Sequence, residues 1–334
     1  MVDYDNFYKD KTILVTGGVG SIGSELVRNL LKQDIKVVRI LDINESKLFE
    51  FEDELDSKKV RTFIGDVRDK DRLKKAIEDV DIVFHAAALK HVPLCEYNPF
   101  EGVKTNVAGT QNLIDAALDE KVEKFITIST DKVVNPINVM GATKLLAERL
   151  TTSADLYKGD RRTVFSVVRF GNVLNSRGSL LPLINKQISK GGPVTLTHPE
   201  MTRFVMSINE AAELVMEAAV KAKGGEIFIL KMPAVRIKEL VEVIVEELAP
   251  KYGYTTDEIE IKDIGIRAGE KLYEELMTTE ETAHAKKIDN MYIVFSRKPF
   301  ENDEVENNFS YRSDKTKLLS RDEIDRLLRK IDYY

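Results

Sequence analysis

Short apolar runs alternate with amphipathic segments through the first 170 residues. The apolar runs are rich in Val and Ile and occupy residues 12–16, 36–42, 60–66, 81–88, 124–130 and 163–170. They are apolar without strict alternation, which is typical of parallel strands covered on both faces. In the segment 21–33, Ile22, Leu26 and Leu30 share one helical face, and 69–79 shows the same pattern. The alternation predicts an α/β fold with a doubly wound parallel sheet of the Rossmann type.

The pattern changes after residue 171. Loops rich in Gly and Pro occupy 174–182 and 189–200, and 207–222 is patterned as a helix followed by a strand at 226–230 that could rejoin the sheet. Beyond it we expect a helix at 236–248, a strand at 258–264 and a helix at 269–279. The predicted division is a first domain at 1–170, rejoined by 205–230, and a smaller α/β part formed by 171–204 and 231–334.

Composition excludes several classes of function. The chain has 334 residues, a net charge of −6 and one cysteine, Cys95. The acidic charge gives no case for nucleic acid or an anionic membrane as partner. A single cysteine excludes an internal disulfide, and His91 with Cys95 is too small a set for a zinc site, so no metal is expected. The N-terminus is polar, and no apolar run reaches the roughly 20 residues of a membrane span. We therefore expect a soluble, cytoplasmic protein.

The sequence TGGVGSIG at 16–23 lies between the first strand and the first helix. Gly17 suits a tight turn, Gly20 a close approach to a pyrophosphate, and Gly23 close packing of helix on strand. Asp42 ends the next strand, where a carboxylate can bind an adenosine ribose and would repel a 2′-phosphate. This combination predicts NAD rather than NADP. The alternative is that the glycines serve only the turn and Asp42 caps a helix.

Other residues lie where a dinucleotide would pass. Asp66 and Val67 follow the third strand and could contact adenine, and small residues after the fourth strand leave room beside the cofactor, although packing roles are equally open. The further candidates for cofactor contact are Ser21, Ile22, Asp66, Val67, Ala86 and Ala87.

Taken together, several motifs resemble one enzyme family. TGGVGSIG, GDVRD (65–69), HAAALKHVP (85–93), STDK (129–132) and MGATK (140–144) resemble the extended short-chain dehydrogenase/reductases. More narrowly, they resemble the UDP-N-acetylglucosamine 4,6-dehydratases of polysaccharide biosynthesis, as do 169–183, 191–204 and 267–276. One branch of that family has Tyr four residues before the conserved Lys and another has Met. Met140 places this chain nearer the Met branch.

The resemblance implies a redox-neutral reaction with tightly bound NAD+. Carbon 4 of the sugar is oxidised, water is eliminated across carbons 5 and 6, and hydride returns to carbon 6. By resemblance, Asp131 is the acid that protonates the departing hydroxyl and Lys132 is the base at carbon 5. Both would have to be neutral in the reactive state. Burial favours this for both, and the positive charges of Lys144 and the nicotinamide are expected to lower the pKa of Lys132 further. Lys144 would hold the nicotinamide ribose.

With Met at 140, another group must pass on the proton of the carbon 4 hydroxyl. Thr130 is the first candidate, because its hydroxyl both donates and accepts. Ser129 is the alternative. Strand alternation would turn residues 129 and 130 to opposite faces, so only one of the two hydroxyls should face the site.

A nucleotide-sugar substrate needs cations for its diphosphate. Arg267, in RAGEKLYEEL, is the strongest candidate, whereas Arg203 could instead be structural and any of the set could be a surface charge. The candidates for substrate contact are Lys90, Asn172, Arg203, Arg236, Arg267 and Glu270. The sequence leaves open UDP against another nucleotide, the stereochemistry at carbon 5, and two other functions, a sugar-nucleotide 4-epimerase and a non-catalytic NAD-binding sensor. A homo-oligomer, dimer or higher, is expected.

Overall fold

The computed structural model describes residues 4–267, 269–295 and 309–334. Within these residues, nine strands form the main sheet in the order β14-β15-β10-β6-β5-β4-β1-β2-β3. Seven neighbouring strands of this sheet, β10, β6, β5, β4, β1, β2 and β3, are parallel, and β15 and β14 add an antiparallel edge beside β10. The bounds are β1 (Thr12–Thr16), β2 (Val37–Asp42), β3 (Val60–Ile64), β4 (Ile82–His85), β5 (Lys124–Ile128), β6 (Val164–Arg169), β10 (Glu226–Leu230), β14 (Ala285–Ile288) and β15 (Met291–Phe295).

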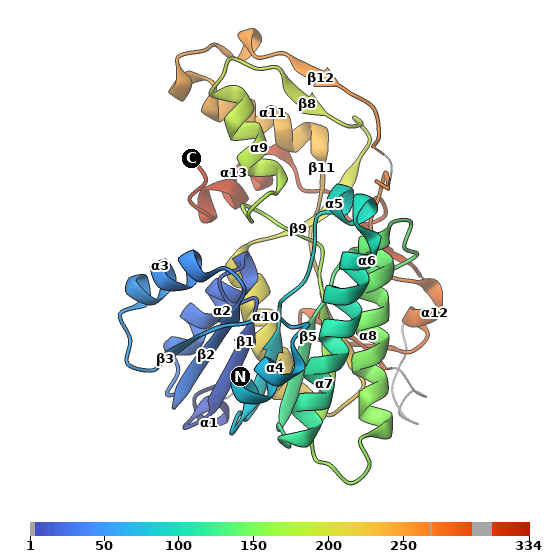
Figure 1. The fold of residues 1–334 in the computed structure, drawn as a ribbon. Helices are drawn as coiled ribbons and strands as arrows, with labels where there is room; N and C mark the ends of the chain where they lie inside the picture. The colour runs from blue at the N-terminus through green and yellow to red at the C-terminus, as the bar shows by residue number, and fades with distance from the viewer. Residues whose placement is uncertain (1–3, 268, 296–308) are drawn as a thin grey trace.

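Helices cover both faces of this sheet, as Figure 1 shows. One face packs against α1 (Tyr4–Tyr8), α2 (Ser21–Leu31), α3 (Glu45–Leu55) and α10 (Ile208–Lys221). The other packs against α4 (Lys70–Ile77), α7 (Gly109–Asp119) and α8 (Val139–Tyr157). Side-chain caps fix several helix starts: Asn44 begins α3, Asp69 begins α4, and Ser207 with Glu210 forms a capping box on α10. The predicted doubly wound fold is confirmed.

A smaller lobe lies beyond the carboxyl ends of the parallel strands, at the top of Figure 1. Its own apolar core is made mainly by one face of each of three helices. Its elements are α9 (Leu180–Ile188), β8 (Val194–Leu196), α11 (Ile237–Leu248), two 3₁₀ turns η3 (Pro250–Tyr252) and η4 (Thr256–Glu258), β12 (Ile261–Asp263) and α13 (Arg321–Lys330).

Short elements join the lobe to the main sheet. The strands β7 (Asn172–Val173), β9 (Thr202–Met206) and β11 (Ala234–Arg236) pair with one another, as do β13 (Glu275–Met277) and β16 (Tyr311–Arg312). The remaining elements are α5 (Val92–Tyr97), α6 (Pro99–Gly102), the π-helical turn η1 (Val103–Ala108), the 3₁₀ turn η2 (Asp131–Val133) and α12 (Thr279–Thr282).

The predicted division into domains stays a prediction, but the sheet bears on it. β10, within 205–230, lies in the main sheet beside β6, and β14 and β15 extend that sheet although they lie in the segment 231–334.

The predicted helix at 269–279 is wrong. Leu276 and Met277 are both fully buried. They lie in β13, which pairs with β16, and Gly269 has a positive φ of 80°. Leu272 and Leu276 have helical spacing, yet Leu272 is 39% exposed. Tertiary contacts with β16 therefore override the local pattern. The strand expected at 258–264 is also shorter, because 256–258 form the 3₁₀ turn η4 before β12.

Candidate active site

The glycine loop after β1 is shaped for a phosphate group. Gly17 has a φ of 66°, and a Cβ there would lie 2.7 Å from the backbone nitrogen of Ala87. A Cβ at Gly23 would collide with the carbonyl oxygen of Gly17. The N-cap of α2 is Gly20, which has no side chain to occupy the first N–H groups of the helix. A pyrophosphate can therefore approach the start of α2 at close range.

Asp42 lies beside this loop. Its Oδ2 accepts a hydrogen bond from the Val19 nitrogen at 3.3 Å, and its Oδ1 accepts one from the Asn44 nitrogen at 3.1 Å. The N-cap of α3 is Asn44, whose side chain accepts from the Lys47 nitrogen. The alternative of Asp42 as a helix cap is therefore wrong. The carboxylate is held at the mouth of the loop, which fits the predicted ribose contact.

The other predicted cofactor residues divide into two groups. Val67 is 3% exposed and packs against Gly109, so its side chain is part of the core, which favours the packing role over a contact with adenine. Asp66 pairs with Arg68 at 2.5 Å, a contact that lowers the pKa of the Asp66 carboxyl. Ala86, Ala87, Ser21 and Ile22 are partly exposed around the glycine loop.

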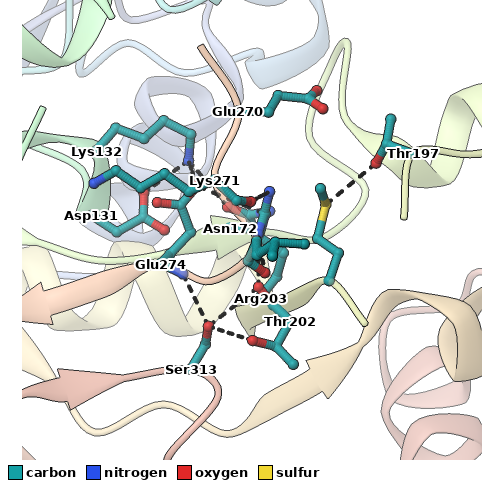
Figure 2. Close-up of polar contacts among 12 residues, drawn as sticks. Asp131, Lys132, Asn172, Thr197, Thr202, Arg203, Glu270, Lys271, Glu274 and Ser313 are labelled. Atoms are coloured by element: carbon teal, nitrogen blue, oxygen red, sulfur yellow. Dashed lines mark hydrogen bonds and ion pairs between the residues drawn. The ribbon is translucent and has the colours of Figure 1, made fainter. Parts of the chain in front are cut away.

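The STDK segment follows β5 and forms the centre of a polar cluster, shown in Figure 2. Asp131 is fully buried, and the Lys132 Nζ lies 2.9 Å from its Oδ1. The same Nζ lies 3.4 Å from Oδ1 of Asn172 in β7 and 3.7 Å from Oε1 of Glu274. Burial alone lowers the pKa of Lys132, but the carboxylates of Asp131 and Glu274 outweigh burial and raise it. The lowering expected for the reactive state, with Asp131 neutral and the nicotinamide bound, stays a prediction, because an ionised Asp131, followed by Glu274, has the opposite effect in the protein alone.

Glu274 is absent from the residues predicted from the sequence. It is 3% exposed, its backbone nitrogen donates to the Ser313 hydroxyl at 3.0 Å, and burial followed by the charge of Asp131 raises the pKa of its carboxyl. The only signal for it in the sequence was its position in RAGEKLYEEL, the motif that supplied Arg267 and Glu270.

Lys144 lies on the first turns of α8 and is 7% exposed. Its Nζ donates to the carbonyl oxygen of Ile128 at 2.5 Å, and burial lowers its pKa to about 8. Met140, one turn earlier, is 4% exposed on the same helix. Between them, Gly141 packs on the carbonyl oxygen of Lys132, and a side chain there would push that carbonyl away. The start of α8 therefore holds the STDK segment in place.

The two hydroxyls of the STDK segment have different surroundings. Thr130 donates to Oδ1 of Asp131 at 2.9 Å, and no hydrogen bond joins it to Lys144 within the described residues. Ser129 is 4% exposed, and its Oγ has no partner in the described part of the chain. Thr130 as proton relay remains a prediction, and the geometry ties it to Asp131 rather than to Lys144.

Of the predicted substrate residues, Asn172 and Arg203 join the cluster. Arg203, in β9, is 7% exposed and donates to the carbonyl oxygens of Thr202 and Lys271, both at 2.8 Å. Its Nε lies 3.8 Å from Oε1 of Glu274. Because the guanidinium of Arg203 is already bonded to these protein groups, the geometry favours a structural role for Arg203 over binding of the substrate diphosphate.

The other four predicted substrate residues lie outside the cluster. Arg267 is exposed and lines a cavity of about 460 Å³ with the N-terminal residues of α9, and its backbone nitrogen donates to Glu270. Arg236 pairs with Glu239 at 3.3 Å and Glu200 at 3.8 Å. Lys90 donates to the carbonyl oxygen of Arg177 at 2.9 Å. A diphosphate site built from three arginines together is not what the structure shows.

The sequence family described as polysaccharide biosynthesis protein matches residues 13–296. The chain belongs to this family. It is 68% identical over 332 residues to an uncharacterized membrane protein of Methanocaldococcus jannaschii, with 99% of each chain covered. It is 40% identical over 328 residues to the UDP-N-acetylglucosamine 4,6-dehydratase (inverting) of Campylobacter jejuni, with 93% of this chain and 95% of the relative covered. It is 39% identical over 345 residues to a UDP-glucose 4-epimerase of Rickettsia bellii, with 98% and 97% covered.

Solved structures agree with this assignment. The protein Pen of Bacillus thuringiensis superposes with a TM-score of 0.92 at 44% identity, over 97% of this chain and 98% of that one. A dTDP-glucose 4,6-dehydratase of Streptomyces venezuelae with NAD bound shares the fold, with a TM-score of 0.70 at 23% identity over 78% and 86%. The identity of 40% to the Campylobacter dehydratase confirms the predicted resemblance to nucleotide-sugar dehydratases. NAD, the cofactor expected from the glycine loop, is named with the Streptomyces structure. Although one relative is called a membrane protein, no helix in the described residues has the length and apolar character to cross a membrane.

Proposed function

We propose that this chain is an NAD-dependent UDP-N-acetylglucosamine 4,6-dehydratase that serves surface polysaccharide or glycan biosynthesis. The observation that carries the proposal is the pair of a fully buried Asp131 and a partly exposed Lys132, 2.9 Å apart at the carboxyl end of β5. Ligands of open α/β sheets bind at that edge. The Campylobacter relative, named as such a dehydratase and 40% identical, supports the substrate.

The glycine loop, Asp42 and Lys144 would hold the cofactor. When bound, NAD+ supplies the hydride acceptor for carbon 4 and the hydride that carbon 6 receives. Proton handling is left to the chain. Lys132, in its neutral form, takes the proton from carbon 5. Asp131, in its acid form, gives a proton to the carbon 6 hydroxyl, which leaves as water. Each such transfer contributes about 10²–10⁴-fold to the rate. The Oδ2 of Asp131 is buried with no partner among the described residues, so it is available to carry that proton.

A 4-epimerase is the second candidate, because the Rickettsia relative with that name is 39% identical over nearly the whole chain. An epimerase oxidises and reduces carbon 4 without eliminating water, so it has no task for an acid and base pair such as Asp131 and Lys132. Position 140, where epimerases of this superfamily rely on Tyr, is Met.

Product analysis separates the candidates. Purified protein is incubated with UDP-N-acetylglucosamine, and the products are followed by mass spectrometry. A dehydratase gives a product lighter by one water, with deuterium at carbon 5 when the reaction runs in deuterated water. An isomer of unchanged mass would favour the epimerase. Bound NAD with no turnover of this or other nucleotide sugars would favour a non-catalytic sensor.

A further inference from the structure

Glu274 is a buried carboxylate in the reaction cluster to which the mechanism above gives no task. It directly precedes β13 and is 3% exposed. Its Oε1 lies 3.7 Å from the Lys132 Nζ and 3.8 Å from the Arg203 Nε. Its Oε2 is also buried and has no hydrogen-bond partner in the part of the chain that the structure describes. Burial of a carboxylate is costly unless it is paired, so this placement calls for a role.

The charged side chains that act on Glu274 come from three parts of the chain, and Figure 2 draws them. Lys132 and Asp131 come from η2, Arg203 from β9, and Lys271 from the segment before β13. Arg203 is held by the carbonyl oxygens of Thr202 and Lys271, and Lys271 Nζ donates to the carbonyl oxygen of Val134 at 2.7 Å. These two cations are fixed by backbone oxygens. Lys132 is the cation whose partners are all side chains, those of Asp131, Asn172 and Glu274.

We propose that Glu274 is a positioning residue for Lys132: its carboxylate holds the amino group beside Asp131 and Asn172 and sets the pH range in which Lys132 can accept a proton. The role rests on the proposed dehydratase function. An anion next to an ammonium group favours the protonated form, so Lys132 loses its proton only at higher pH while Glu274 is ionised. Removing the negative charge moves that loss to lower pH.

The test is the substitution Glu274→Gln, which keeps the shape of the side chain and removes the charge. The matched control is Glu275→Gln, because Glu275 is its neighbour, and its carboxylate accepts from Asn135 at 2.8 Å, outside the cluster. In wild type and the control, the rate of water loss should rise with pH along the same limb. In Glu274→Gln, the midpoint of that limb should move down by about 1–3 pH units, the usual effect of one close opposite charge.

A second readout needs no turnover. Each protein is labelled with a trace of acetic anhydride at a series of pH values, and acetylation of Lys132 is measured by peptide mass spectrometry. The midpoint of labelling should move to lower pH in Glu274→Gln and stay in place in Glu275→Gln. If wild type releases no lighter product, the proposed function fails while this measurement still decides the role of Glu274.

Two outcomes overturn the proposal. One is a Glu274→Gln enzyme whose rate is lower at every pH with an unchanged midpoint, which marks a purely structural residue. The other is an unchanged Lys132 labelling midpoint. If Glu274→Gln does not fold, Glu274→Asp replaces it: the shorter charged side chain should keep the wild-type labelling midpoint and reduce turnover, and a shifted midpoint would contradict the role.

Discussion

Replacing Arg169 with Met should destabilise the protein strongly, because Arg169 is the centre of a buried ion cluster. It lies in β6, is 1% exposed, and pairs with Glu148 of α8 at 2.8 Å and with Glu281 of α12 at 2.9 Å. Its Nη1 also donates to the carbonyl oxygen of Leu276 at 2.8 Å. The two carboxylates raise the pKa of Arg169 although burial opposes them, so the guanidinium stays charged. Without it, two carboxylates face each other with no cation between them.

Removing one partner of a buried ion pair costs about 3–5 kcal/mol. Unfolding entropy is about 2.1 cal/mol/K per residue, or about 0.7 kcal/mol/K for a chain of 334 residues. The expected fall in the midpoint of thermal unfolding is therefore about 4–7 °C. Arg169 also donates to the carbonyl oxygen of Leu276, two residues beyond Glu274. The proposed dehydratase activity should therefore decrease even at temperatures at which the variant is still folded.

Differential scanning calorimetry at neutral pH measures the effect. Glu281→Gln should cost less than Arg169→Met, since the Glu281 side chain is 18% exposed and solvent can compensate part of the loss. The double variant Arg169→Met with Glu148→Met removes the two charges of the more deeply buried pair and leaves only the partly exposed Glu281 carboxylate. It should recover part of the stability, because apolar side chains can replace a buried pair. A midpoint for Arg169→Met within about 1 °C of wild type would refute the reasoning, as would a double variant less stable than the single one.

Four further predictions concern the site. Gly17→Ala should lose bound NAD, measured after denaturation, because a left-handed conformation costs about 1–2 kcal/mol for other residues and the new Cβ meets the Ala87 backbone. Lys132→Met should keep NAD yet lower the rate of water loss by at least about 10²-fold; full activity would remove Lys132 as the base. Ser129→Ala should slow reduction of the bound cofactor more than Thr130→Val in single-turnover absorbance, since the Ser129 hydroxyl is free of protein partners in the described residues; the reverse order would restore Thr130. Lys144 has a pKa lowered to about 8, so between pH 8 and 10 Lys144 keeps its proton only in the unfolded state. Over this range the free energy of unfolding of the wild type, relative to that of Lys144→Met, should rise by about 1.4 kcal/mol per pH unit. Urea titrations at a series of pH values measure it.

The parallel sheet could be predicted from the sequence because its strands are buried on both faces. Runs of Val and Ile with no alternation mark such strands whatever covers them. Three predicted strands nevertheless end early: β3 at Ile64, β4 at His85 and β5 at Ile128. The next residues leave the sheet and carry the site, including Asp131 after β5. Their apolar or small character continues the strand pattern, so composition alone does not reveal where the ladder of hydrogen bonds stops.

The structure of residues 269–277 could not be predicted from the sequence, because contacts with distant parts of the chain determine it. Asn138 donates to the carbonyl oxygen of Gly269, and Lys271 donates to that of Val134, so this segment lies across the loop between η2 and α8. β16, which pairs with β13, begins at Tyr311. No local periodicity encodes these contacts. The buried position of Glu274 follows from them, which is why its carboxylate could not be assigned to the site from spacing.

The contacts around Met140 show what the start of α8 offers in place of the Tyr found in the other branch of the family. Met140 is 4% exposed and packs inside, so it adds no proton carrier beside Lys144. The Lys144 amino group is held by the carbonyl of Ile128, the residue that precedes Ser129. Thr130 already donates to Asp131, the proposed acid of the elimination step. If a side-chain hydroxyl of this segment replaces the Tyr, Ser129 is the one whose oxygen is not already engaged in the described structure. The hydride step and the elimination step would then use the two adjacent hydroxyls, Ser129 and Thr130, of the short segment that follows β5.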